Sequence, residues 1–275
     1  MLILCAAVIW SRGDKMTEAK VVSHLVSQWH TQVLRLTAFP GPDFAAGETS
    51  WWADLVGQRP ERQVSQPREA HFLTEGPFQG GKLSLSVEFN RVDWLLAAAE
   101  EPASNTEGFP TIGPFPDTLE GFLHLMLRWL GSEDCPELAR VAFGSVLLQP
   151  VGSRDESYRR LGSYLPSLQL DAQGSSDFLY RINRPRASTA GLAGLRINRL
   201  STWSAVVLRS AKFAIGTGPG PTVWSSAREE HACRLELDVN TMSDFKGLLP
   251  RQHVVGVFQE LVNLGKEIAE RGDIP

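Results

Sequence analysis

Cysteine is scarce in this sequence of 275 residues. The three cysteines, Cys5, Cys135 and Cys233, are far apart, form no C-x-x-C pair and leave one thiol unpaired in any disulfide scheme. This spacing excludes a disulfide-rich secreted scaffold and a zinc ribbon. We therefore expect reduced thiols and a cytoplasmic protein.

Sequence signatures of catalysis are also missing. There is no P-loop, no G-x-G-x-x-G after a strand, and no H-E-x-x-H, G-x-S-x-G or EF-hand pattern. The six histidines never stand at ligand spacing with a cysteine or an acidic residue. We expect no cofactor and no metal site. A binding protein without catalytic activity is favoured over an enzyme.

The sequence has no apolar run long enough to cross a bilayer. The apolar stretch at residues 1–10 is too short, lacks a basic start, and is followed by charged residues where a signal-peptide cleavage site belongs. We expect no membrane partner. Residues 1–15 are interpreted as a leader or an over-extended start before Met16, residues 16–136 as a first α+β half, and residues 137–275 as a second half packed into the same body.

The sequence does contain a series of short elements typical of a globular α+β protein, with 43% apolar and 21% charged residues. Alternation predicts strands at 31–39, 83–89, 92–96, 140–150, 201–213 and 232–240, and three-to-four periodicity predicts helices at 17–30, 117–131, 153–165 and 251–271. Residues 40–70 are expected to form a long loop with a short helix at Trp51 and Trp52. Runs of strands closed by a helix predict an antiparallel sheet covered on one side by helices, and the layout suggests a duplicated unit.

The tetrapeptide RINR occurs twice, at residues 181–184 and 196–199. Alternation buries Ile182 and Ile197 and places Arg181, Asn183, Arg196 and Asn198 on one outer surface. We predict an antiparallel hairpin with Ile182 beside Ile197. In that register Arg181 faces Asn198, and Asn183 faces Arg196.

Positive charge gathers around this repeat. Residues 177–215 hold seven basic residues and one acidic residue, a local net charge of +6 in a chain whose formal net charge is −4. Guanidinium groups beside amides suit phosphate or carboxylate groups, so a nucleic acid or an acidic protein surface is the expected partner. The predicted ligand-binding residues are Arg181, Asn183, Arg184, Arg186, Arg196, Asn198, Arg209 and Lys212. The alternative is that acidic residues neutralise the patch and the repeat is only a hairpin.

Two carboxylates suggest another chemistry. Alternation in the strand 232–240 places Glu236 and Asp238 two residues apart on one outer face, near enough for acid/base work or a metal. A second hypothesis is therefore an enzyme that acts on a phosphorylated or carboxylated small molecule, although cross-strand ion pairing is the favoured role of these carboxylates. A third is a structural subunit of a larger complex with exposed Trp51, Trp52 and Trp224.

The strand ACRLELDVN, the variable loop after it and the closing helix RQHVVGVFQELVNLGKEIAE are similar to a sporadically distributed family of uncharacterised bacterial proteins. The resemblance covers the C-terminal third and the general layout. It implies an α+β domain without known catalytic residues, found patchily in genomes as accessory and defence-related genes often are. No residue of the double RINR takes a role from it. The favoured function is a non-catalytic binding or accessory protein that works through the arginine-bearing sheet face.

Overall fold

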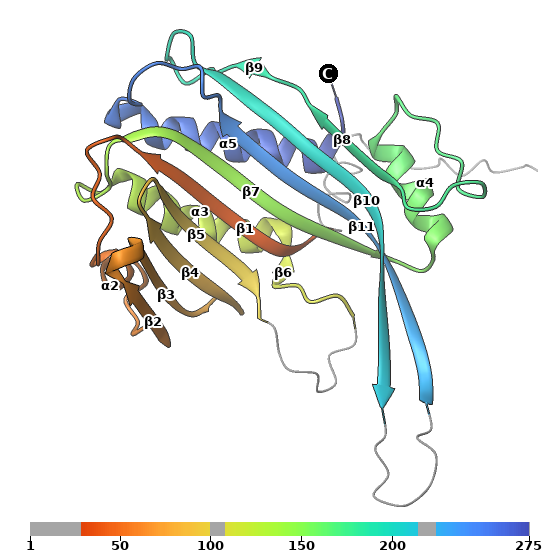
Figure 1. Cartoon of the computed structure of the whole chain (residues 1–275). Helices are drawn as coiled ribbons and strands as arrows, with labels where there is room; N and C mark the ends of the chain where they lie inside the picture. Colours follow the sequence, from red (N-terminus) through yellow and green to blue (C-terminus); the bar gives the residue numbers. More distant parts are fainter. Residues whose placement is uncertain (1–28, 100–107, 214–223, 275) are drawn as a thin grey trace, which may run out of the picture.

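The computed structural model describes residues 29–99, 108–213 and 224–274 (Figure 1). The interpretation of residues 1–15 and Met16 falls outside this range, as does nearly all of the helix expected at 17–30. The backbone is also described at Lys212 and Trp224, but not the positions of their side chains.

Within these residues, eleven strands form one antiparallel sheet in the order β2-β3-β4-β5-β1-β7-β11-β10-β8, with β6 beside β1 and β9 beside β10. The strands are β1 (His30–Pro40), β2 (Arg62–Gln66), β3 (His71–Phe78), β4 (Gly81–Glu88), β5 (Arg91–Ala98), β6 (Gly113–Pro114), β7 (Leu138–Val151), β8 (Leu179–Asn183), β9 (Arg186–Ala187), β10 (Arg196–Phe213) and β11 (Trp224–Thr241). The longest strands, β10 and β11, extend past the body as a two-stranded ribbon (Figure 1).

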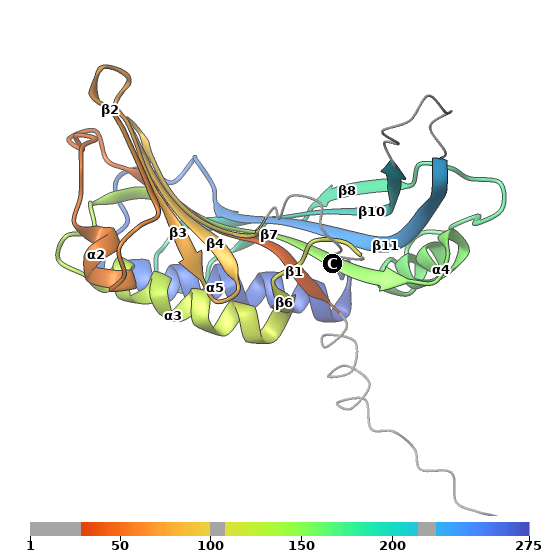
Figure 2. The ribbon, with the colours of Figure 1, turned by 90° about the horizontal axis from the view of Figure 1, so that it is seen from below.

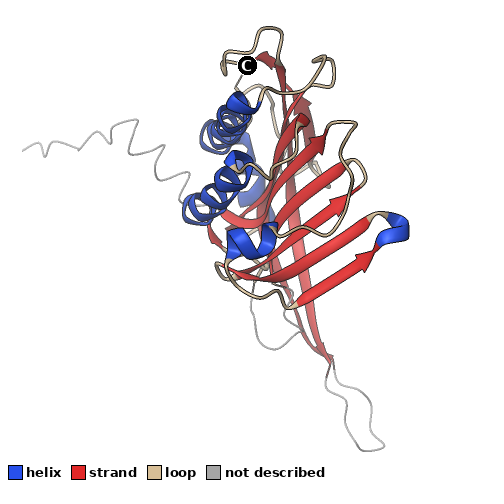
Figure 3. Ribbon diagram, turned by 90° about the vertical axis from the view of Figure 1, so that its left-hand side faces the viewer, coloured by secondary structure: helices blue, strands red, loops and turns tan. Residues whose placement is uncertain are grey.

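The helices all lie on one face of this sheet (Figures 2 and 3). They are α2 (Trp51–Val56), α3 (Phe115–Gly131), α4 (Arg154–Tyr164) and α5 (Arg251–Arg271), and a single 3-10 turn, η1 (Pro67–Glu69), follows β2. The predicted α+β class, with an antiparallel sheet covered on one side by helices, is confirmed. None of the described helices is long and apolar enough to cross a membrane.

The core lies between the sheet and the helices, as the alternation of the strands requires. Leu34, Leu36 and Ala38 of β1 are fully buried against the helix layer, and the same alternation buries the apolar residues of β4 and β5. The hairpin of these two strands is confirmed. Its turn includes Phe89, which alternation assigns to the buried face but which is 73% exposed.

The two tryptophans of α2 belong to this core. The ring of Trp51 packs edge-on against Trp129 with centroids 5.4 Å apart, and the ring of Trp52 stacks on Trp94 at 6.4 Å. Both side chains are buried. The hypothesis that they form an exposed contact surface is wrong, because they fix the segment before β2 to the helix layer.

One sheet runs through both halves of the chain. β1 from the first half lies between β5 of the same half and β7 of the second half, and pairs with both. The long loop predicted at 40–70 holds β2 as well as α2, and β3 follows it. These strands lack a clear alternation because β2 is an edge strand with little buried surface.

Candidate functional site

The sheet face opposite the helices carries no helix among the described residues (Figure 2). We call this the open face, made by the outward side chains of β5, β1, β7, β11, β10 and β8. It is concave, because the β2 end of the sheet and the β10–β11 ribbon rise on the same side (Figure 2). Antiparallel sheets often leave one face in water, so the composition and shape of this face decide what it can do.

Two rows of side chains cross the open face at right angles to the strands. The first row is Leu95, Arg35, Gly144, Asp238, Leu200 and Asn183, on β5, β1, β7, β11, β10 and β8 in turn. The second row is Ala97, Val33, Val146, Glu236, Thr202 and Arg181 on the same strands. The register therefore places a cation toward each side of the face and two anions between them.

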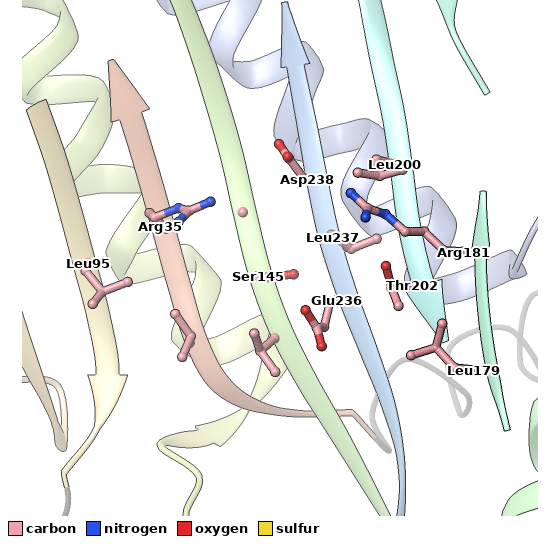
Figure 4. Close-up of a pocket in the computed structure, with 13 residues that line it drawn as sticks. Arg35, Leu95, Ser145, Leu179, Arg181, Leu200, Thr202, Glu236, Leu237 and Asp238 are labelled. Atoms are coloured by element: carbon pink, nitrogen blue, oxygen red, sulfur yellow. The ribbon is translucent and has the colours of Figure 1, made fainter. Parts of the chain in front are cut away.

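A hollow of about 510 Å³ lies over these rows. The charged side chains at its lining are Arg35, Arg181, Glu236 and Asp238, and the apolar ones include Leu95, Leu179 and Leu200 (Figure 4). Leu179 on the edge strand β8 is 67% exposed. Charge and apolar surface therefore meet in one concave place, which is the usual character of a binding site.

Arg35 is the residue of this hollow that the sequence analysis missed. Its side chain reaches from β1 toward β7 and Asp238 (Figure 4). A Cβ atom at position 144 would lie 3.3 Å from the Arg35 Nε atom, so the glycine leaves the space in which the guanidinium lies. No carboxylate among the described residues forms an ion pair with Arg35. Only the cross-strand register reveals this position, because nothing near Arg35 in sequence is unusual.

Arg181 occupies the opposite side of the hollow. Its side chain extends from β8 across β10 toward β11 (Figure 4), and its guanidinium has no ion-pair partner in the part of the chain that the structure describes. β8 and β1 are four strand spacings apart in the sheet, roughly 19 Å between backbones. The two guanidinium groups therefore point inward from opposite sides of one hollow.

The two carboxylates between them already have partners. The Glu236 Oε1 atom lies 2.7 Å from the Arg234 Nη1 atom, and Asp238 Oδ1 accepts a hydrogen bond of 2.9 Å from the Asn240 side chain. Both partners lie on β11 itself and only the Glu236 contact is an ion pair, so these contacts are not the cross-strand ion pairs that the sequence favours. Glu236 and Asp238 remain candidate catalytic residues only because they line the hollow.

The double RINR forms the predicted faces but not the predicted register. Ile182 pairs with Ser201 instead of Ile197, a shift of four residues. Because four is even, Arg181 and Asn183 stay on the outer face. The two asparagines of the repeat meet directly, with Asn183 Nδ2 donating to Asn198 Oδ1 at 2.9 Å.

The asparagine contact is part of a chain of amides across three strands. Asn198 donates to Asn240 at 3.0 Å, and Asn183 accepts from the backbone N–H of Arg199 at 3.0 Å. These bonds hold the short edge strand β8 against β10. The predicted Arg/Asn pairs are replaced by Asn/Asn pairs, because the four-residue shift moves Arg181 opposite Thr202.

Arg184 does not belong to the open face. It binds the carboxylate of Asp273 with two bonds, of 2.5 and 2.8 Å, at the chain's C-terminal end on the helix side. Asp273 is buried, and Tyr180 also donates to it at 3.3 Å. The bound carboxylate raises the pKa of Arg184, and burial followed by the Asp273 charge raises that of Tyr180. Arg184 therefore already has an internal carboxylate partner, and its role in binding an external ligand stays a prediction.

The other predicted basic residues are distributed over different surfaces. Arg186 pairs with Ile197 in the sheet and therefore lies on the helix side, where it lines a pocket together with Glu260 of α5. Arg209, on the β10–β11 ribbon, pairs with Glu229 at 2.8 Å. The predicted ligand-binding residues whose side chains are described therefore do not all share one surface. Arg181, Asn183, Arg196 and Asn198 share the open face, and the backbone of Lys212 lies in the ribbon opposite Ser225.

No group of three or more histidine, cysteine or acidic side chains within the described ranges is placed to hold a metal ion. Comparison of the chain with protein-family models, curated proteins and solved structures finds no match. The similarity of the C-terminal third to a sporadically distributed bacterial family stays a prediction.

Proposed function

We propose that this chain is a non-catalytic binding protein whose open face receives an acidic segment of a partner protein, in an accessory role. The observation that carries the proposal is the pair Arg35 and Arg181, two guanidinium groups without an ion-pair partner among the described residues that point into one hollow. Unpaired guanidinium groups beside apolar surface favour a carboxylate ligand, because each offers a planar pair of donors.

A protein partner fits this face better than a nucleic acid does. Glu236 and Asp238 lie between the arginines and repel a phosphate backbone, whose charges are closely and evenly spaced. The apolar side chains of Leu95, Leu179 and Leu200 add surface that a phosphate backbone cannot use. Two of the basic residues that made a nucleic-acid partner attractive are paired outside the hollow, Arg184 with Asp273 and Arg209 with Glu229.

The test uses two polyanions of different kinds. Fluorescence anisotropy at low salt measures binding of a labelled random copolymer of glutamate and tyrosine, and of a short DNA duplex, to the full chain. The copolymer is expected to bind at least about tenfold more tightly than the duplex. The double variant Arg35→Glu/Arg181→Glu is expected to lose binding of the copolymer by about a hundredfold, since two charge-assisted contacts become repulsive.

Two results would contradict the proposal. Equal or tighter binding of the duplex would favour a nucleic-acid partner, and unchanged binding of the copolymer to the double variant would remove the open face from the interaction. The charge-reversal variant Arg209→Glu is the matched control, because Arg209 is a basic residue of β10 outside the hollow.

A further inference from the structure

The hollow over Gly144 differs from the rest of the open face in one respect. Gly144 lies between Arg35 and Asp238 in the same row, so β7 has no side chain at this position beside the two charged groups. The neighbouring row has Val146 at the corresponding position of β7. Because Gly144 has no side chain, the Arg35 guanidinium lies close to the sheet there, at the floor of the hollow, where a residue such as Val146 would hold it away.

We propose that a carboxylate side chain of the partner, aspartate or glutamate, enters this hollow and binds the guanidinium groups of Arg35 and Arg181. This inference rests on the proposed function and specifies where on the open face the partner is anchored. It assigns the main contribution to Arg35 and Gly144, which lie outside the arginine-rich segment of the sequence.

Two guanidinium groups of the hollow can bind an anion, although two carboxylates lie between them. Glu236 is paired with Arg234 at 2.7 Å, and Asp238 accepts a hydrogen bond from Asn240. Arg35 and Arg181 are the cations of the hollow, and neither has a carboxylate partner among the described residues. A carboxylate from outside completes the hydrogen bonds of these guanidinium groups in a site partly screened from water, where such bonds are stronger than at a flat surface.

The apolar part of the lining limits the kind of segment that brings the carboxylate. Leu95 lies at one end of the first row and Leu200 near the other, and Leu179 lies beside Arg181. A segment with apolar side chains on both sides of its acidic residue buries this surface, whereas a free anion such as phosphate leaves it in water. An acidic residue flanked by apolar ones is therefore the ligand that the hollow favours.

Substitution of Gly144 tests the site without removing a charge. Gly144→Val places a β-branched side chain in a central strand, where it has a high β-propensity, and fills the space beneath the Arg35 guanidinium. The three heavy atoms nearest to the added Cβ atom all belong to the Arg35 side chain, which can move, so we expect the variant to fold. Circular dichroism and the urea midpoint check this directly.

The experiment measures anisotropy of the labelled glutamate–tyrosine copolymer with four proteins: the natural chain, Gly144→Val, Arg35→Gln and Arg196→Gln. We expect Gly144→Val and Arg35→Gln to bind about tenfold more weakly than the natural chain. Arg196→Gln should bind within about twofold of it, since Arg196 is exposed on the open face but does not line the hollow.

The outcomes separate this inference from the proposed function. If the natural chain binds the copolymer and both Gly144→Val and Arg35→Gln bind equally well, the partner uses the open face but not the hollow, and the inference is overturned. Equal losses in all three variants would indicate diffuse attraction and would also overturn it. If Gly144→Val does not fold, Arg35→Gln compared with Arg196→Gln decides the question. Absence of binding by the natural chain would contradict the proposed function itself.

Discussion

Single residues in this protein have roles that depend on their partners more than on their type. Arg184 and Arg209 are both arginines of the basic segment, but Arg184 is bound to the buried Asp273, whereas Arg209 pairs with Glu229 in water. The side chain of Arg209 is 75% exposed and that of Arg184 28%. These differences give direct predictions of stability.

We expect Arg184→Gln to lower the free energy of unfolding by about 2 kcal/mol, because it leaves the carboxylate of Asp273 buried with one hydrogen-bond partner fewer. Arg209→Gln should change this free energy by no more than about 0.5 kcal/mol, since its ion pair is exposed. Urea titration followed by circular dichroism measures both values. Similar losses in the two variants would refute the assignment of Arg184 as an anchor of the C-terminal end.

A glycine at the end of α5 supports the same anchor. Gly272 has a φ of +80°, and a Cβ atom at this position would overlap the backbone of Tyr164, whose carbonyl oxygen accepts from Asp273 N at 2.9 Å. We predict that Gly272→Ala lowers the free energy of unfolding by at least about 2 kcal/mol. Gly256→Ala, in the interior of α5 where no atom lies within 4 Å of the new Cβ, should instead raise it by roughly 0.5–1 kcal/mol.

Helices and strands were predictable from the sequence where the periodicity of apolar residues was strong. The register in which the strands pair was not predictable. The alternation of residues 31–39 and 83–96 predicts β1, β4 and β5 with their buried faces, and the stripe of 117–131 predicts α3. Its start is two residues earlier than predicted, at Phe115, because Pro116 suits the first turn of a helix. The register of β8 on β10 was missed by four residues, since a shift by an even number keeps every side chain on its predicted face.

The amide chain at the edge of the sheet predicts a local effect on β8. Asn198 accepts from Asn183 and donates to Asn240. We expect Asn198→Ala to speed amide hydrogen exchange in β8 by about tenfold, because an edge strand of five residues loses one of the two hydrogen bonds that the Asn183 side chain makes to β10. Exchange in the central strands β1 and β7 should be unchanged. Mass spectrometry of peptides from each strand measures this, and equal acceleration in all of them would mean global destabilisation instead.

At the scale of the whole molecule, one sheet joins the two halves that the sequence suggests. A buried thiol reports on each half: Cys135 lies at the end of the first and Cys233 in the second. Burial raises the pKa of both thiols to about 12, so at neutral pH each stays protonated and unreactive while the fold is intact. The common sheet predicts that they become reactive together.

Alkylation of a Cys5→Ser variant across a urea gradient tests this prediction. Peptide mass spectrometry should give one midpoint for modification of Cys135 and Cys233, in agreement with the midpoint from circular dichroism. If Cys135 is modified at a clearly lower urea concentration than Cys233, the halves unfold independently in spite of the shared sheet.

The candidate site could be predicted only in part from the sequence, because its residues come from strands that are distant in sequence. The basic segment pointed to Arg181, Asn183, Arg196 and Asn198, and the structure places these on one face. The cation opposite Arg181 is Arg35, which lies on a strand distant in sequence and reaches the hollow through the pairing of β1 with β7 and of β7 with β11. No local pattern contains that information, because long-range register is fixed by the packing of the entire sheet.

We propose that an acidic protein segment binds the open face at Arg35 and Arg181. Nuclear magnetic resonance of the arginine Nε–Hε groups, during titration with the glutamate–tyrosine copolymer, tests it most directly because each guanidinium gives its own signal. We expect the signals of Arg35 and Arg181 to shift and to saturate at the same copolymer concentration, while those of Arg184 and Arg209 stay in place. Shifts confined to Arg184 or Arg209, or no shift at Arg35 under saturating copolymer, would contradict it.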